Sequence, residues 1–174
     1  YYDWSFWGGT GEVGLTWSDA SSGLDENGIK ADDSHGFALS LVRTRTGFSD
    51  PESLHKTARH VGTGPAKTFT AGFDTFTDPT GTYIRPDPDE SWRVRATDHW
   101  VIKPLECLSL GTALVYQYTD FGPNLPEQHW ISAGFRPIYH FNDWASLAFE
   151  GGVDWISNSP NGNDGTLGKI TIAP

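Results

Sequence analysis

Leu108–Trp155 reads LSLGTALVYQYTDFGPNLPEQHWISAGFRPIYHFNDWASLAFEGGVDW, and this stretch decides the fold. It contains three segments in which apolar residues alternate with polar or small ones: Leu108–Tyr118, His129–His140 and Trp144–Ile156. Successive side chains of a β-strand point to opposite faces, so an alternation with a period of two predicts strands. We therefore expect three consecutive strands, each with one apolar face and one polar face.

Two kinds of protein produce this alternation. A soluble β-sandwich packs its apolar faces into a core and turns its polar faces to water. A transmembrane β-barrel turns its apolar face to lipid and its polar face to a wet lumen. The connections favour the barrel, because only Phe141–Asp143 separates the second and third segments, whereas the longer TDFGPNLPEQ, residues 119–128, separates the first two. Short turns at one end and longer loops at the other are typical of outer-membrane barrels.

The composition agrees with a barrel and excludes other classes. Aromatic residues make up 14% of the chain, which suits the aromatic girdles of a barrel. The net charge of −10 argues against a nucleic-acid partner, because such proteins present basic faces. The single Cys107 excludes an internal disulfide, and we expect it to be a small buried residue.

Six further strands are expected outside this stretch, which gives an antiparallel meander of about nine strands in an all-β fold. Their expected bounds are Tyr2–Gly8, Glu12–Ser18, His35–Thr46, Lys67–Thr77, Ser91–Ile102 and Leu167–Ala173. The segment Gly47–Pro65 is read as an insertion that breaks the alternation of short and long connections.

An odd number of strands with two unpaired edges does not make a closed bacterial barrel. The chain also has no methionine, no signal peptide and an abrupt end within a strand. We therefore expect residues 1–174 to form a partial porin barrel domain, with further strands before and after it.

Three runs resemble the maltoporin family, the LamB-type carbohydrate porins. They are the residues from Trp92 to Tyr118, the run from His129 to Trp155 with its GFRPIY sequence at 134–139, and the LGKITIAP ending. The resemblance implies an 18-stranded transmembrane barrel, a homotrimer in the outer membrane of a Gram-negative cell, and passage of maltose and maltodextrins.

No catalytic constellation, metal site or cofactor site is expected. Glu150 and Asp154 share a face, but four residues along a strand span about 13 Å, and glycosidase pairs need roughly 5 to 9.5 Å. None of the six histidines forms a metal-binding spacing such as H-E-x-x-H, and no serine lies in a G-x-S-x-G motif.

The polar positions of the strands are the candidate sugar-binding positions. A sugar offers an apolar ring face and a rim of hydroxyls, so a sugar path needs aromatic surfaces and exchangeable hydrogen-bonding groups. The candidates that face the lumen are Arg93, Arg95, Gln117, Trp130, Arg136, His140, Glu150 and Asp154, with Lys169 on the same face. Two structural alternatives remain: Arg136 and Glu150 could pair across strands to stiffen the wall, and Trp130 could belong to a girdle.

The opposite positions should face outer-membrane lipid or a neighbouring subunit. They include Leu110, Leu114, Ile131, Phe135, Leu147, Phe149, Ile170 and Ile172, with Tyr116, Tyr118, Trp144 and Trp155 near the strand ends. The aligned position of the family's mid-chain aromatic slide is Ala66, so no slide residue is transferred, and sucrose or glucosides stay open beside maltodextrins. A soluble carbohydrate-binding sandwich and a general diffusion porin are the alternative functions.

Overall fold

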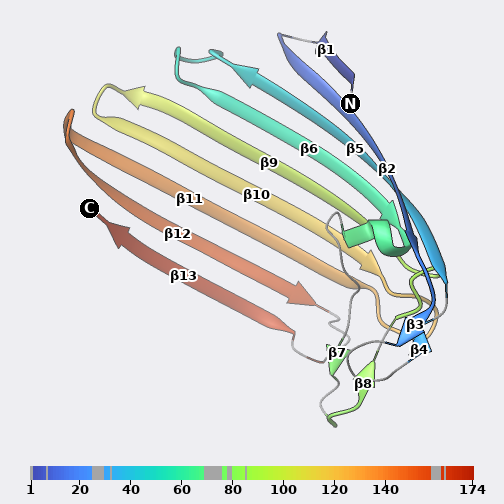
Figure 1. Ribbon diagram of the computed structural model, residues 1–174. Coiled ribbons are helices and arrows are strands. Elements are labelled where there is room, and N and C mark those ends of the chain that lie inside the picture. The colour runs from blue at the N-terminus through green and yellow to red at the C-terminus, as the bar shows by residue number, and fades with distance from the viewer. Residues whose placement is uncertain are drawn as a thin grey trace.

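The fold is one large antiparallel sheet with small additions at one end (Figure 1). The computed structural model describes all residues except 1, 7, 25–29, 32, 69–75, 78–79, 85, 158–161 and 163. The strands of the large sheet are β1 (Tyr2–Phe6), β2 (Gly9–Ala20), β5 (Ser34–Thr46), β6 (Leu54–Thr63), β9 (Trp92–Leu105), β10 (Leu108–Asp120), β11 (Gln128–Asn142), β12 (Ala145–Ser157) and β13 (Gly165–Ala173). The additions are the pairs β3 (Gly23–Leu24) with β4 (Lys30–Ala31) and β7 (Phe76–Thr77) with β8 (Tyr83–Ile84), and the 3₁₀ helix η1 (Gly64–Thr68).

Each strand of the nine-stranded sheet pairs with its successor along the chain, in the order β1-β2-β5-β6-β9-β10-β11-β12-β13. The all-β class and the antiparallel meander are confirmed. The sheet is open, with β1 and β13 at its edges, and it curls around the side on which η1 lies (Figure 1). An open, curled antiparallel meander of this kind has the geometry of a section of a β-barrel wall.

One expected strand was wrong. The strand after β5 is Leu54–Thr63, which lies inside the expected insertion, whereas Lys67 and Thr68 belong to η1. Residues 69–75 of the expected strand Lys67–Thr77 lie outside the described residues, and only Phe76–Thr77 is a strand. The error has a physical cause: LHKTARHVGT places polar residues on both of its faces, so β6 lacks the apolar alternation that marks the other strands.

With β6 in place, successive connections lie at alternate ends of the sheet. Two residues join β1 to β2, β9 to β10 and β11 to β12, and the turn at 47–53 joins β5 to β6 at the same end. The connections at the other end, from β2 to β5, β6 to β9, β10 to β11 and β12 to β13, have seven or more residues. We call the first of these ends the short-turn end and the second the long-loop end.

The turn at 47–53 between β5 and β6 is held by a compact hydrogen-bond network. The Ser53 hydroxyl is buried, accepts a bond from the Phe48 amide at 2.8 Å and donates to the Asp50 carbonyl at 2.7 Å. The Asp50 carboxylate accepts the backbone amide of Lys103 in β9 at 3.0 Å. The Lys103 bond above all, with further bonds from Ser49, Glu52 and Ser53, holds the pKa of the Asp50 carboxyl below its ordinary value of 3.8.

The described residues contain almost no apolar core. Their buried hydrophobic residues are Ala38, Ala58, Ala66 and Phe121, which are small apart from the last. Large apolar side chains are instead exposed on one face, including Leu15 at 80%, Leu114 at 52% and Ile170 at 75%. A sandwich would bury these side chains between two sheets, so the soluble sandwich alternative is wrong for this chain.

Aromatic residues gather at both ends of this apolar face. At the long-loop end, Trp92 packs on Tyr118 with ring centroids 5.0 Å apart, and Tyr118 packs on His129 at 5.2 Å. At the short-turn end, Tyr139 packs on Phe141 at 5.1 Å, and Trp100 lies on the same side of β9 as Trp92. Trp92 and Trp100 are eight residues apart, about 26 Å along the strand, or roughly 20 Å along the membrane normal for a strand tilted by about 40°.

The exposed apolar face between two aromatic bands matches the surface of a barrel in lipid, whose apolar band is about 25 Å tall. None of the described residues forms a helix long and apolar enough to cross a bilayer.

Candidate functional site: the polar face of the sheet

The strand register brings the expected site residues onto one face. Gln117 lies opposite Arg95 on β9 and opposite Trp130 on β11, and directly opposed residues point to the same side of a sheet. The same alternation places the remaining members on this side: Arg93, Arg136, His140, Glu150, Asp154 and Lys169. We call this side the polar face, and the opposite side the apolar face.

A row of interacting side chains crosses the polar face at right angles to the strands. Arg95 donates from Nε and Nη2 to the Gln117 side-chain oxygen, at 2.8 and 2.5 Å. The Arg95 guanidinium also lies 5.9 Å from the centre of the Trp130 ring, within the range of a cation–π contact. Trp130 then donates from its indole nitrogen to Asp154 on β12 at 3.1 Å. Trp130 is thus tied into the polar face, and its assignment to a girdle is wrong.

His60 and Ser40 extend this row to β6 and β5, and the sequence reasoning missed both. His60 is opposite Arg95 in the register, and its Nδ1 lies 2.8 Å from the Ser40 hydroxyl. The row, which we call the polar row, is therefore Ser40–His60–Arg95–Gln117–Trp130–Asp154 on six neighbouring strands. His60 was missed because its strand was not predicted. The available signal was that His60 shares one face with every second residue from Leu54 to Gly62 once this segment is read as a strand.

Arg93 supports the polar row from the long-loop side. Its Nε donates to the Thr119 hydroxyl at 2.9 Å, and the amide nitrogen of Gln117 lies 3.3 Å from the same hydroxyl. Thr119 is fully buried and Arg93 is 7% exposed. Arg93 therefore fixes the neighbouring strands and the Gln117 amide, and it offers little surface to a solute.

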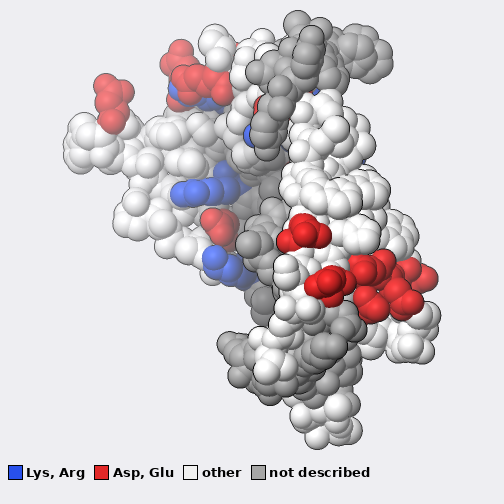
Figure 2. Space-filling view, turned by 45° about the vertical axis from the view of Figure 1, so that its right-hand side comes forward, with Lys and Arg blue, Asp and Glu red and all other residues white. Residues whose placement is uncertain are grey.

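Small residues hollow out the polar face beside the polar row. Gly111, Ala113, Gly134 and Gly152 stand at polar-face positions on β10–β12 and leave a hollow of about 510 Å³. Charged side chains border it, namely Arg136, Glu150, Asp154 and Lys169. Basic and acidic side chains lie close together toward the left of the view in Figure 2.

Glu150 pairs with Lys169 of β13 at 3.5 Å. The expected Arg136–Glu150 pair is not among the ion pairs of the described residues, so Arg136 borders the hollow without that partner. Both Glu150 and Lys169 are substantially exposed, at 45% and 71% of their side chains, and an exposed pair of this kind is weak. The Glu150 carboxylate and the Lys169 ammonium can therefore exchange this contact for a solute.

His140 lies apart from the polar row, toward the short-turn end. Its Nε2 is 3.0 Å from the Ser109 hydroxyl, and its backbone amide donates to the Cys107 carbonyl at 2.8 Å. Cys107 is half-buried in the β9–β10 turn, so the expectation of a buried residue holds only in part. Within the described part of the chain, no group of three or more His, Cys, Asp or Glu side chains could hold a metal ion.

The 3₁₀ helix η1 lies on the polar face near the long-loop end. A side chain at Gly62 would meet the Lys67 backbone, with its Cβ 2.7 Å from the Lys67 Cα, and one at Gly36 would meet the Thr63 carbonyl oxygen. Glycines at these two positions are thus what lets the chain fold back over β5 and β6. Ala66, the expected slide position, is buried in η1 and presents no aromatic surface.

A sheet with an exposed apolar face, two aromatic bands and a hydrogen-bonded, charged opposite face is the wall of a transmembrane β-barrel pore. The sequence matches the family model described as LamB porin over residues 1–174. The chain belongs to the LamB porin family, a family of outer-membrane channels.

Proposed function

We propose that the polar face lines a water-filled path for oligosaccharides across the outer membrane. The polar row carries this proposal, because it supplies donors and acceptors in one plane across six strands. A sugar hydroxyl both donates and accepts, so it can replace any one of these contacts without leaving a buried group unsatisfied. Maltose, maltodextrins or related oligosaccharides are the proposed solutes.

We also propose a homotrimeric, 18-stranded assembly in the outer membrane, with residues 1–174 as part of each barrel. The edge strands β1 and β13 expose unpaired backbone groups, which a lipid environment does not tolerate. Closure of the barrel by further strands pairs them. Outer-membrane fractionation and the mass of the protein in mild detergent test these two points.

The test of sugar passage is a planar-bilayer recording of the full-length protein that carries this chain, with maltotriose added to one side. The expected result is a concentration-dependent block of the ion current. Gln117→Ala should shorten each block several-fold, because Arg95 loses its acceptor and the polar row is broken at its centre. The matched control is Tyr116→Phe, one residue away on the apolar face, which should leave the block unchanged.

A general diffusion porin without sugar preference is the second candidate, and one observation favours it. Trp130 is the single Trp, Tyr or Phe at the described strand positions of the polar face from β2 to β13, and Arg95 lies over its ring. Sugar-specific channels need aromatic surfaces for stacking. Current that maltotriose and sucrose never block, through channels of normal conductance, would establish this second function and exclude the first.

A further inference from the structure

The apolar face carries a local group of charged side chains on β5, β6 and β9. Arg43, Arg45 and Arg59 alternate with the polar-face residues of β5 and β6, and Asp98 does so on β9. The apolar-face positions of β10–β13 between the two aromatic bands hold no Lys, Arg, Asp or Glu. We call the three arginines the basic patch. Its charge is concentrated on one sector of a face that otherwise suits acyl chains.

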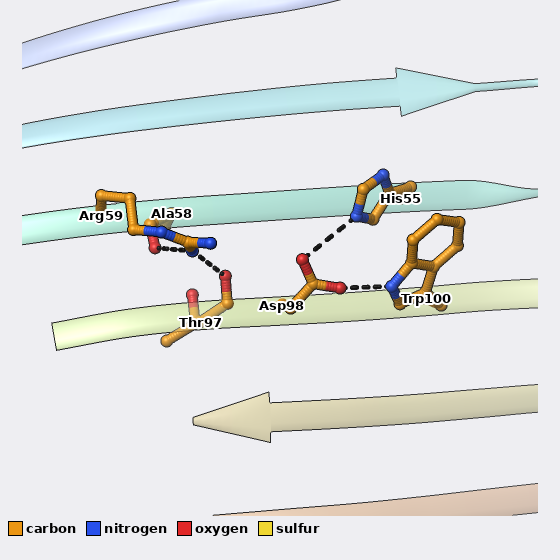
Figure 3. Close-up of polar contacts among 6 residues, drawn as sticks. All are labelled: His55, Ala58, Arg59, Thr97, Asp98 and Trp100. Carbon is orange, nitrogen blue, oxygen red and sulfur yellow. Dashed lines mark hydrogen bonds and ion pairs between the residues drawn. The ribbon is translucent and has the colours of Figure 1, made fainter. Parts of the chain in front are cut away.

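The one carboxylate in this sector is already engaged (Figure 3). Asp98 lies 3.3 Å from His55 Nε2, and it accepts the indole N–H of Trp100. The His55 and Trp100 rings stack with centroids 3.6 Å apart. Asp98 therefore holds two members of the short-turn aromatic band in place.

Within the part of the chain that the structure describes, the hydrogen bonds of Arg59 go to neutral acceptors. Its Nη1 donates to the backbone carbonyls of Ala58 and Thr97, at 2.9 and 3.0 Å, and both acceptors are neutral. In Figure 3 its side chain runs along the sheet from β6 toward Asp98, which is toward the short-turn end. An arginine on a barrel's lipid face is costly at mid-depth and tolerated near the interface, so this direction relieves part of the cost.

Arg45 lies at the interface level itself. It is opposite His55 in the register, and its guanidinium carbon is 5.5 Å from the centre of the Phe48 ring in the turn at 47–53. Arg43 lies two residues farther from the short-turn end along β5, opposite Thr57. The basic patch thus begins at the short-turn aromatic band, where lipid headgroups meet the barrel, and extends inward from it.

We propose that the basic patch binds the headgroup of an anionic phospholipid in the leaflet at the short-turn end. A guanidinium donates two parallel bonds to phosphate oxygens. Arg45 contacts an aromatic ring and Arg59 contacts neutral carbonyls, so these two arginines give the sector a positive charge that favours a lipid with net negative charge. The site needs only that the chain spans a membrane, and it does not depend on which solute the pore passes.

The full-length protein in phosphatidylcholine vesicles, probed with spin-labelled lipids, tests this proposal. The readout is the association of phosphatidylglycerol relative to phosphatidylcholine. We expect the wild type to prefer phosphatidylglycerol, and Arg45→Gln or Arg59→Gln to lower that preference by about fivefold each at low salt. Arg59→Lys should retain the preference, and it also serves if Arg59→Gln does not fold. The matched control, Arg136→Gln on the polar face, should leave the preference unchanged.

Equal association of the two lipids with the wild type would overturn the proposal, as would a preference that neither glutamine variant lowers. A loss of oligomer mass in mild detergent, without a change in lipid preference, would show instead that the basic patch contacts protein, which also overturns it. Blockade by maltotriose is measured on the Arg45 and Arg59 variants and should not change. A failure of the lipid site is therefore distinguishable from a failure of sugar passage.

Discussion

At the scale of single residues, the neighbouring glycines Gly151 and Gly152 on β12 face opposite sides of the sheet and have different roles. Gly152 faces the hollow of the polar face, and a Cβ there would meet the Ala133 carbonyl oxygen at 3.4 Å, an ordinary contact. Gly151 faces the other way, and its Cβ would lie 2.7 Å from the Phe135 ring. One position thus keeps space open in the lumen, and the other lets an aromatic ring lie flat on the sheet.

We predict that substitutions at these two glycines affect different properties: conductance at Gly152 and stability at Gly151. Gly152→Val should lower single-channel conductance, because the side chain fills part of the hollow, with little loss of stability. Gly151→Ala should leave conductance unchanged and cost about 1 kcal/mol of unfolding free energy, at the low end of overpacking because the half-exposed Phe135 ring can turn away. Single-channel recording and urea unfolding in detergent measure both. Equal effects of the two variants on conductance would contradict the assignment of the faces.

Asp50 gives a prediction about pH. Its folded pKa lies below the ordinary value of 3.8, chiefly because its carboxylate accepts the Lys103 amide. The stabilisation by a carboxyl with a lowered pKa is present above the unfolded pKa and is lost as the pH falls through the folded pKa. Asp50→Ala should therefore lower the thermal unfolding temperature at pH 7, and the difference from wild type should shrink as the pH falls below 3.8.

A difference between Asp50→Ala and wild type that stays constant from pH 7 to pH 2.5 would show that the side chain acts through packing and not through its charge.

At the scale of secondary-structure elements, η1 is attached to the sheet through glycines. Gly62→Ala places a Cβ against the Lys67 backbone, and backbone cannot rotate away as the end of a side chain can. We expect η1 to be displaced and unfolding in urea to become easier by about 1–3 kcal/mol. Gly168→Ala on β13 is the control, because nothing lies within 4 Å of its added Cβ. Similar losses of unfolding free energy for both variants would mean that the cost comes from the restricted backbone of the new alanine and not from a clash with η1.

The strands differ in how well the sequence pattern predicts them. The strands from Leu108 onward were predictable, because their apolar and polar faces alternate along most of their length, and β9 was predictable despite the charged Asp98 on its apolar face. β6 was not, because His55 and Arg59 stand on its apolar face and erase the alternation. His60 and its partner Ser40, which form the β5–β6 part of the polar row, were therefore not predicted. The Arg95–Gln117 bond was also beyond prediction, because a register between strands follows from pairing and not from the pattern within one strand.

At the scale of the whole molecule, the assignment of the two faces can be tested with neighbouring residues. In a variant with Cys107→Ala, single cysteines are placed at Val115 on the polar face and at Leu114 on the apolar face. After reconstitution into vesicles, a charged, membrane-impermeant thiol reagent should modify the cysteine at 115 and spare the one at 114. The reverse pattern would place water on the apolar face and contradict a transmembrane wall.

Side chains of the polar row are already paired before any solute arrives, as Ser40 with His60, Arg95 with Gln117, and Trp130 with Asp154. A solute that meets such a wall exchanges one hydrogen bond for another of similar strength, so each step forward meets only a small barrier and no deep trap. Such a wall therefore slows the solute little and favours fast passage over tight binding. Removal of one member of the polar row, as in Gln117→Ala, interrupts this exchange and should shorten the time that each sugar spends at the wall.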